Sequence, residues 1–105
     1  MATSTGKVIS LEAAADWVRD GDQIVMSGKM DWTPMAMLRS LVRRGAQDLR
    51  LVGVVGAALN ADFLTGAGSV ASIDTCSVGL NPFNRDAPNF VRALLRGQIK
   101  MLDNT

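Results

Sequence analysis

The fold is decided by one stretch of sequence, DGDQIVMSGKMDWTPMAMLRSLVRRG, residues 20–45. A short apolar run at residues 23–27 lies between two glycine-containing turns, which is typical of a strand buried on both faces. Thr33 and Pro34 then predict a helix start, with the threonine hydroxyl as cap and proline at the first helical position. Apolar residues at helical spacing continue this helix up to Gly45, which suits a left-handed helix end.

The same alternation extends along the chain in both directions. An apolar stripe that begins after Ser10 predicts a helix ending near Asp20. Strands are predicted at residues 49–55, 70–76 and 99–102, and further helices begin at Asn60 and Pro88. A helix between successive strands implies parallel strands joined by right-handed crossovers. The predicted class is therefore α/β, an open and mostly parallel sheet with helices on both faces.

The composition indicates one modest soluble domain, because the 105 residues are 48% hydrophobic and 20% charged. The formal net charge is +1 and the basic residues are scattered, so binding to nucleic acid or to a membrane is not expected. Residues 1–7 are polar and are not followed by the apolar segment of a secretory signal. A cytoplasmic location is predicted.

Few residues in the chain could carry catalysis. Histidine is absent, which removes the usual general base and the commonest transition-metal ligand, so no metal site is predicted. The single cysteine, Cys76, is interpreted as a small buried hydrophobe rather than a nucleophile. The only glutamate, Glu12, is explained by the first turn of a helix, where it meets the positive helix end. We therefore assign no catalytic residue to this chain.

The candidate binding site is the set of loops at the carboxyl ends of the strands, where an open parallel sheet binds its ligands. These loops are residues 27–33, 56–60 and 77–86. Backbone amides of the first loop could face an oxyanion or phosphate, although an ordinary β–α turn has the same pattern and its charged residues suit a solvated surface. The candidate substrate-binding residues are Ser27, Gly28, Lys29, Met30, Asp31, Gly56, Ala57, Ser77 and Gly79.

A series of short motifs follows the chain from residue 7 to residue 93. They are KVISLEAA (7–14), DGDQIVMSG (20–28), TPMA (33–36), LVRRG (41–45), DL (48–49), GAGSV (66–70), APNF (87–90) and RA (92–93). In order and spacing they resemble the start of family I coenzyme A-transferase α subunits. Glutaconate and 3-oxoacid CoA-transferases are similar, as are ring-opening hydrolases of CoA thioesters that share the fold. The resemblance implies that residues 1–105 are the N-terminal portion of a single domain of this kind.

The resemblance also implies a reaction. The substrates would be an acyl-CoA and a free carboxylic acid, with the coenzyme A thioester as substrate and no permanently bound cofactor. The nucleophile would be a glutamate on a β subunit, the partner of this chain. The α subunit would supply a glycine-rich loop near the thioester and the other CoA-binding loops, and would be inactive alone.

Two departures from the family pattern accompany the resemblance. Ser27, Gly28 and Lys29 stand where the family has two glycines and an aromatic residue. Family subunits also continue well beyond the position of Thr105, so we expect a fragment, a truncated product or an obligate partner. Two alternatives to a transferase component stay open, namely a subunit of a ring-opening hydrolase and a truncated, non-catalytic interaction module.

Overall fold

Helices and strands alternate along the chain. The structure, a computed structural model, describes residues 6–28, 30–54 and 56–103. The elements of these residues are α1 (Leu11–Ala15), β1 (Gln23–Met26), α2 (Met35–Arg44), β2 (Leu49–Gly53), α3 (Leu59–Gly66), β3 (Val70–Thr75), α4 (Pro88–Leu95) and β4 (Lys100–Asp103). Each strand that the sequence predicts is present within one or two residues of its expected bounds.

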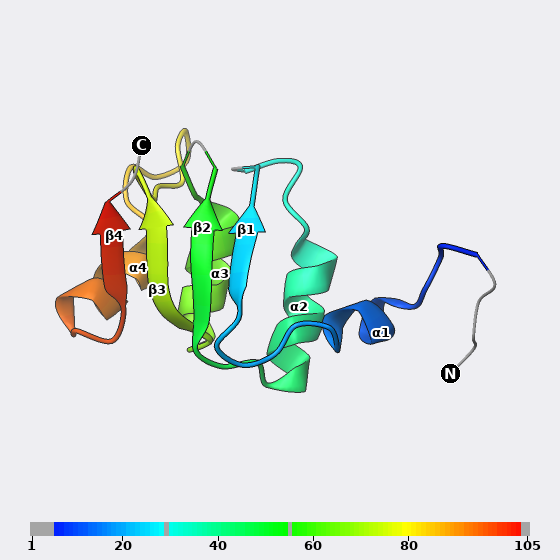
Figure 1. Cartoon of the computed structure of the whole chain (residues 1–105). Coiled ribbons are helices and arrows are strands. Elements are labelled where there is room, and N and C mark those ends of the chain that lie inside the picture. Colours follow the sequence, from blue (N-terminus) through cyan, green and yellow to red (C-terminus); the bar gives the residue numbers. More distant parts are fainter. Residues whose placement is uncertain (1–5, 29, 55, 104–105) are drawn as a thin grey trace.

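The strands form one parallel sheet in the order β1-β2-β3-β4, which confirms the predicted α/β class. Each strand lies beside the one that follows it in sequence, so every crossover steps in the same direction across the sheet. Crossovers of one hand that step in one direction place their helices on one face. Figure 1 shows α3 and α4 behind the strands and α2 beside β1, and α2 contacts α3. The described residues therefore supply helices to one face, whereas the sequence alternation predicts them on both.

The hydrophobic core lies between the sheet and these helices. In register across the sheet, Ile24, Leu51, Ile73 and Met101 form a row that faces the helical layer. Leu51 and Ile73, in the two central strands, are completely buried, as are Leu38, Leu41 and Leu64 of the helices. Burial of each such side chain contributes about 1.5–3 kcal/mol, so this layer accounts for most of the stability of the fold.

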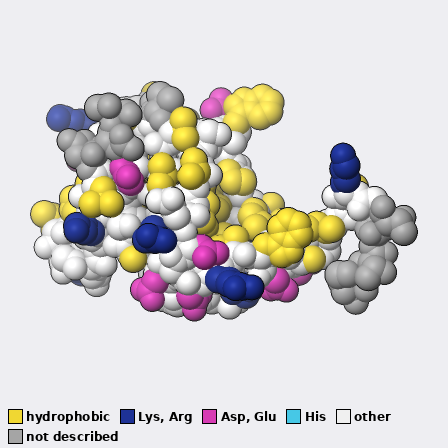
Figure 2. Space-filling model, in the orientation of Figure 1, with side chains coloured by type: hydrophobic (Ala, Val, Ile, Leu, Met, Phe, Trp, Pro, Cys, Tyr) yellow, Lys and Arg dark blue, Asp and Glu magenta, His cyan; other side chains and the backbone are white. Residues whose placement is uncertain are grey.

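The other face of the sheet is open in the described residues. The row next to the buried one consists of Val25, Val52, Asp74 and Leu102 in register. Val25 is 62% exposed, so the prediction that its strand is buried on both faces is wrong, because no described helix covers this side. One carboxylate oxygen of Asp74 is buried without a hydrogen-bond partner among the described residues. Figure 2, which views this face, shows hydrophobic side chains interspersed with charged ones.

Local chemistry sets the helix ends, not always as the sequence predicts. Ser10 caps α1 as expected, accepting a bond from the Ala13 amide, but the helix ends at Ala15 instead of near Asp20 because the next bonds span three residues. At α2, Pro34 occupies the capping position and the Thr33 hydroxyl has no partner in the described part of the chain, so the predicted threonine cap is wrong. The end of α2 at Gly45 (φ 85°) and the start of α4 at Pro88 agree with the prediction.

Asp62 joins α3 to α4. Its side chain is buried, one carboxylate oxygen accepts a 2.8 Å bond from the Phe90 amide and the other a 3.1 Å bond from the Asn89 side chain. The Phe90 amide belongs to the first turn of α4, and Ala87, which precedes the helix at the capping position, has no side chain that can cap it. A residue of one helix therefore caps the next helix.

None of the helices in the described ranges is long and apolar enough to cross a membrane.

The loss of this cap should destabilise the fold. Asp62→Ala leaves the first turn of α4 with an unsatisfied, buried amide, and we expect it to lower the free energy of unfolding by about 1–2 kcal/mol. Urea denaturation followed by circular dichroism measures this change. Asp31→Ala, at an exposed aspartate of a loop, is the matched control and should stay within about 0.5 kcal/mol of the wild type. Equal stability of the two variants would contradict the capping role.

Candidate functional site

Three loops meet at the carboxyl edge of the sheet, which is the upper edge in Figure 1. The loops after β1, β2 and β3 together contain all the residues that the sequence predicts for binding. Ser27, Asp31 and Ser77 are exposed and Gly28, Met30 and Gly79 are half-buried, whereas Gly56 and Ala57 are buried. Lys29 lies outside the described residues.

The second and third loops are joined through their backbones. The Ala57 amide donates a 2.9 Å bond to the Ser77 carbonyl, and the Gly79 amide donates a 3.2 Å bond to the Ala57 carbonyl. These bonds form a parallel bridge between Ala57 and Val78 beyond the ends of the strands. The predicted residues of these two loops therefore belong to one local structure. Ala57 takes part in it through its backbone N–H and carbonyl, which bond to the third loop.

The first and second loops are joined by a side chain, that of Asn60. Its amide nitrogen donates a 3.3 Å bond to the Gly28 carbonyl, 32 residues earlier in the chain. Its oxygen accepts bonds from the Ala61 amide at 2.7 Å and the Ala58 amide at 3.4 Å. The sequence predicts Asn60 only as the start of a helix. It lies instead at the second position of α3, and its link to the first loop could not be read from local sequence.

Gly28 is the point on which the first loop turns back. Its φ of +89° lies in the region that favours glycine, and a Cβ at this position would stand 2.8 Å from the carbonyl oxygens of both Asp31 and Trp32. The loop is therefore folded against its own glycine, and a side chain at residue 28 could enter only if the loop moved. Trp32 also has a positive φ, 57°, which is unusual for a bulky residue.

Two aromatic side chains project from the loops of this edge. Trp32 is 94% exposed on the first loop and Phe83 is 79% exposed on the third. The sequence prediction does not include either of them, although a lone aromatic residue in a polar loop is a signal for a contact surface. Together with the exposed Ser27, Asp31 and Ser77, they give the edge the mixture of apolar faces and polar groups that binding sites for small molecules use.

No described residue at this edge has the arrangement of a catalytic nucleophile. Cys76 is exposed, so its prediction as a buried hydrophobe is wrong: β3 ends one residue earlier, at Thr75, and the thiol lies 3.9 Å from the Ser77 hydroxyl. In the described part of the chain, no group of acidic or cysteine side chains could hold a metal ion. The edge can position a ligand through backbone groups, hydroxyls and aromatic faces.

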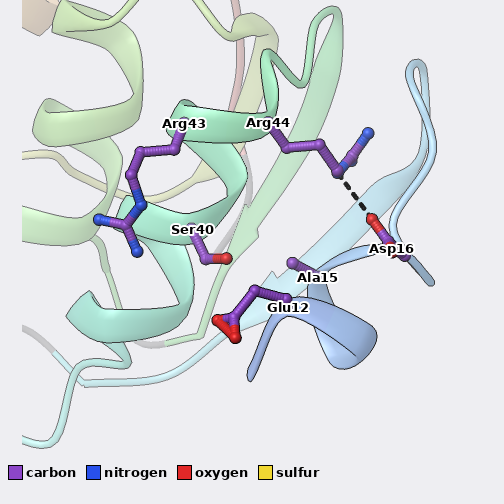
Figure 3. A pocket seen from close by; sticks show the side chains of 6 residues that line it. All are labelled: Glu12, Ala15, Asp16, Ser40, Arg43 and Arg44. Carbon is purple, nitrogen blue, oxygen red and sulfur yellow. Dashed lines mark ion pairs between the residues drawn. The ribbon is translucent and has the colours of Figure 1, made fainter. Parts of the chain in front are cut away.

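A separate cavity of about 230 Å³ lies between α1 and α2 (Figure 3). Its lining consists of Glu12, Ala15, Asp16, Ser40, Arg43 and Arg44. Arg44 forms an ion pair with Asp16 at 4.0 Å and also donates a hydrogen bond to the Val18 carbonyl. These contacts attach α1 to the C-terminal end of α2. Figure 1 places α1 towards the amino ends of the strands, so the only glutamate, Glu12, lies away from the three loops.

The chain was compared with known proteins by sequence and by structure, and the structural comparison gives its fold. The sequence matches no family model and no curated protein. Solved structures, by contrast, include strong matches in shape, and these establish a CoA-transferase-like fold for the chain. The fold that the sequence resemblance implies is therefore confirmed.

Two of the matching structures show the extent of the similarity. Glutaconate coenzyme A-transferase from Acidaminococcus fermentans is similar with a TM-score of 0.86 and 27% identity, over 95% of this chain and 32% of that chain. A cysteine-to-serine variant of the decarboxylase AibA/AibB is similar with a TM-score of 0.78 and 27% identity, over 92% of this chain and 38% of that chain. The chain thus spans about a third of the length of these solved proteins.

Two glycines with nearly the same backbone conformation allow a test of the first loop. Gly28→Ala should displace the loop, because its methyl group would meet two carbonyl oxygens in addition to the cost of a positive φ. Gly21→Ala, at φ +83° with nothing within 4 Å of the new carbon, should cost only the backbone term, about 1 kcal/mol. Amide NMR shifts and urea denaturation measure both effects.

Only Gly28→Ala should move the amide signals of residues 27–28 and 30–33, and it should lose at least about 1 kcal/mol more stability than Gly21→Ala. Unchanged loop signals in Gly28→Ala would show that the loop is not folded against its glycine.

Proposed function

We propose that this chain is the N-terminal portion, residues 1–105, of a subunit of a cytoplasmic CoA-transferase. In this proposal the loops at the carboxyl edge bind an acyl-CoA and a free carboxylic acid, between which CoA is moved. The observation that carries the proposal is the combination of a CoA-transferase-like fold over 95% of the chain with three loops held together at the edge where such a sheet binds ligands.

The catalytic glutamate of the proposed reaction belongs to a β subunit. A carboxylate nucleophile attacks the thioester carbonyl, the thiolate of CoA leaves, and an acyl–enzyme anhydride forms; the thiolate then attacks the glutamyl carbonyl, which releases the first carboxylic acid and leaves an enzyme–CoA thioester. The second carboxylic acid attacks this thioester and expels the thiolate to form a new anhydride, and the thiolate attacks the acyl carbonyl of that anhydride, which yields the new acyl-CoA and regenerates the glutamate. This chain has a single glutamate, and Glu12 lies in the first turn of α1, beside α2 and away from the loops. The role that we assign to this chain is to bind and orient, with the thioester as substrate and no resident cofactor.

A second reaction class stays in the proposal because of one comparison. The solved structure of AibA/AibB is named a decarboxylase, so a chain of this shape also occurs in an enzyme that breaks a carbon–carbon bond. A ring-opening hydrolase of CoA thioesters is the corresponding alternative from the sequence. Both alternatives use the same loops and differ from transfer in the product. The remaining alternative is a non-catalytic interaction module, for which no turnover of substrate is expected.

Reconstitution with a partner distinguishes these functions. The chain is co-expressed with a β subunit that carries a candidate glutamate, and the complex is incubated with an acyl-CoA and a labelled carboxylic acid. We expect label to enter the CoA ester, and we expect no exchange from the 105-residue chain alone. The same complex with the partner's glutamate replaced by glutamine is the matched control and should be inactive.

Each other outcome identifies a different function. Free CoA without exchange indicates a hydrolase, and release of carbon dioxide indicates a decarboxylase. Exchange by the chain alone would contradict the assignment of the glutamate to a partner, and no association with any such partner would favour the interaction module.

A further inference from the structure

We propose that Asn60 is the positioning residue of the candidate site, and that its side-chain amide sets the first loop relative to the other two. The effect of this placement of the first loop on ligand binding rests on the proposed function. The role itself rests on the contacts of Asn60, which is 1% exposed and whose side chain bonds to two different structures.

The contacts fix the orientation of the Asn60 amide. Its oxygen faces the amides of Ala58 and Ala61, both hydrogen-bond donors, and its nitrogen faces the Gly28 carbonyl, an acceptor. The reverse orientation would oppose donors to donors and an acceptor to an acceptor, so only one orientation is compatible with the surroundings. The start of α3 needs only the oxygen. The nitrogen serves the first loop.

No other common side chain of this size meets both requirements. An aspartate at residue 60 would keep the acceptor for α3 and, when ionised, would turn a second acceptor towards the Gly28 carbonyl. A serine would keep an acceptor near the helix start but is too short to reach the loop. The requirement for asparagine therefore comes from the contact with Gly28, 32 residues away, rather than from the helix.

The position of Gly28 affects the rest of the first loop, because the loop is folded against this glycine. The carbonyl oxygens of Asp31 and Trp32 occupy the side of Gly28 on which a Cβ would stand, 2.8 Å from each of them, so this part of the loop lies directly over the glycine. On the other side, Asn60 holds the Ala58 amide, and the adjacent Ala57 bonds to the third loop. The buried side chain of Asn60 thus connects the first loop, which carries the exposed Trp32, to the second loop and through it to the third.

The test uses loop mobility in the chain itself and then ligand binding in the reconstituted complex. Backbone ¹⁵N relaxation in the wild type should give order parameters of about 0.85 for the described residues of the first loop, as for a rigid backbone. Asn60→Asp at neutral pH should lower them to about 0.6 or less, with α3 still formed. Asn60→Ser is the second variant and should give the same loosened loop if Asn60→Asp does not fold.

Acidification provides a rescue that a purely structural role would not show. A protonated carboxyl can donate to the Gly28 carbonyl while its other oxygen still accepts from α3, so the loop of Asn60→Asp should become rigid again as pH falls through the pKa of the introduced carboxyl. Asp31 on the loop and Asp62 on α3 are present in the wild type as well, which is measured at the same pH values as the control. Asn60→Ser should not be rescued.

The control variant on the same helix is Thr65→Val, which replaces a buried hydroxyl, without a hydrogen-bond partner among the described residues, by a methyl group. It should leave the loop unchanged. In the reconstituted complex, Asn60→Asp should raise the KM for acyl-CoA about tenfold with kcat nearly constant, because the loosened first loop binds the ground state and the transition state equally less well.

A rigid loop in Asn60→Asp at neutral pH would overturn the proposed role of Asn60. A wild-type complex without CoA binding would overturn the proposed function, while the relaxation data would still decide the role of Asn60 in the loop. A mobile loop with unchanged KM would show that Asn60 positions the loop but that the loop does not contact the substrate, which overturns the link to binding.

Discussion

The buried layer between the sheet and its helices is the constraint on which the other features depend. Leu51 and Ile73 in the central strands belong to the same core cluster as Leu64 of α3, and all three are completely buried. The crossovers step in one direction, so the helices share one face, and because the strands are parallel all three strand–helix loops open at the same edge. The candidate site is therefore a consequence of how the apolar side chains are covered. Its loops converge because the strands beneath them are packed in register.

Helix α3 occupies the central place in this arrangement and has three tasks. Leu64 packs into the core, Asp62 caps α4, and Asn60 holds the first loop. The two polar residues are buried and each has hydrogen-bond partners, which is the usual condition for polar groups in an interior. Each of them has at least one of these partners outside α3. A displacement of this helix would therefore affect the core, the neighbouring helix and the candidate site together.

Much of the fold could be predicted from the sequence because its signals are local. The apolar runs give the strands, and Gly45 and Pro88 mark helix ends through their own backbone chemistry. The open face could not be predicted, because whether Val25 is covered depends on the direction of the crossovers rather than on its neighbours in sequence. The alternation of strands and helices is enough to group the three loops at one edge, but the bond from Asn60 to Gly28 joins residues that only the folded chain brings together.

The sequential strand order also has a consequence for how the chain folds. Because spatial neighbours are sequence neighbours, each β–α–β unit closes a short segment of chain, and no strand must be threaded between two others. Each closure spans a single crossover between consecutive parallel strands, so units can add stepwise to a growing sheet. The two outer strands, β1 and β4, are the places where this growth begins or continues. At either edge, another strand could pair without rearrangement of those already formed.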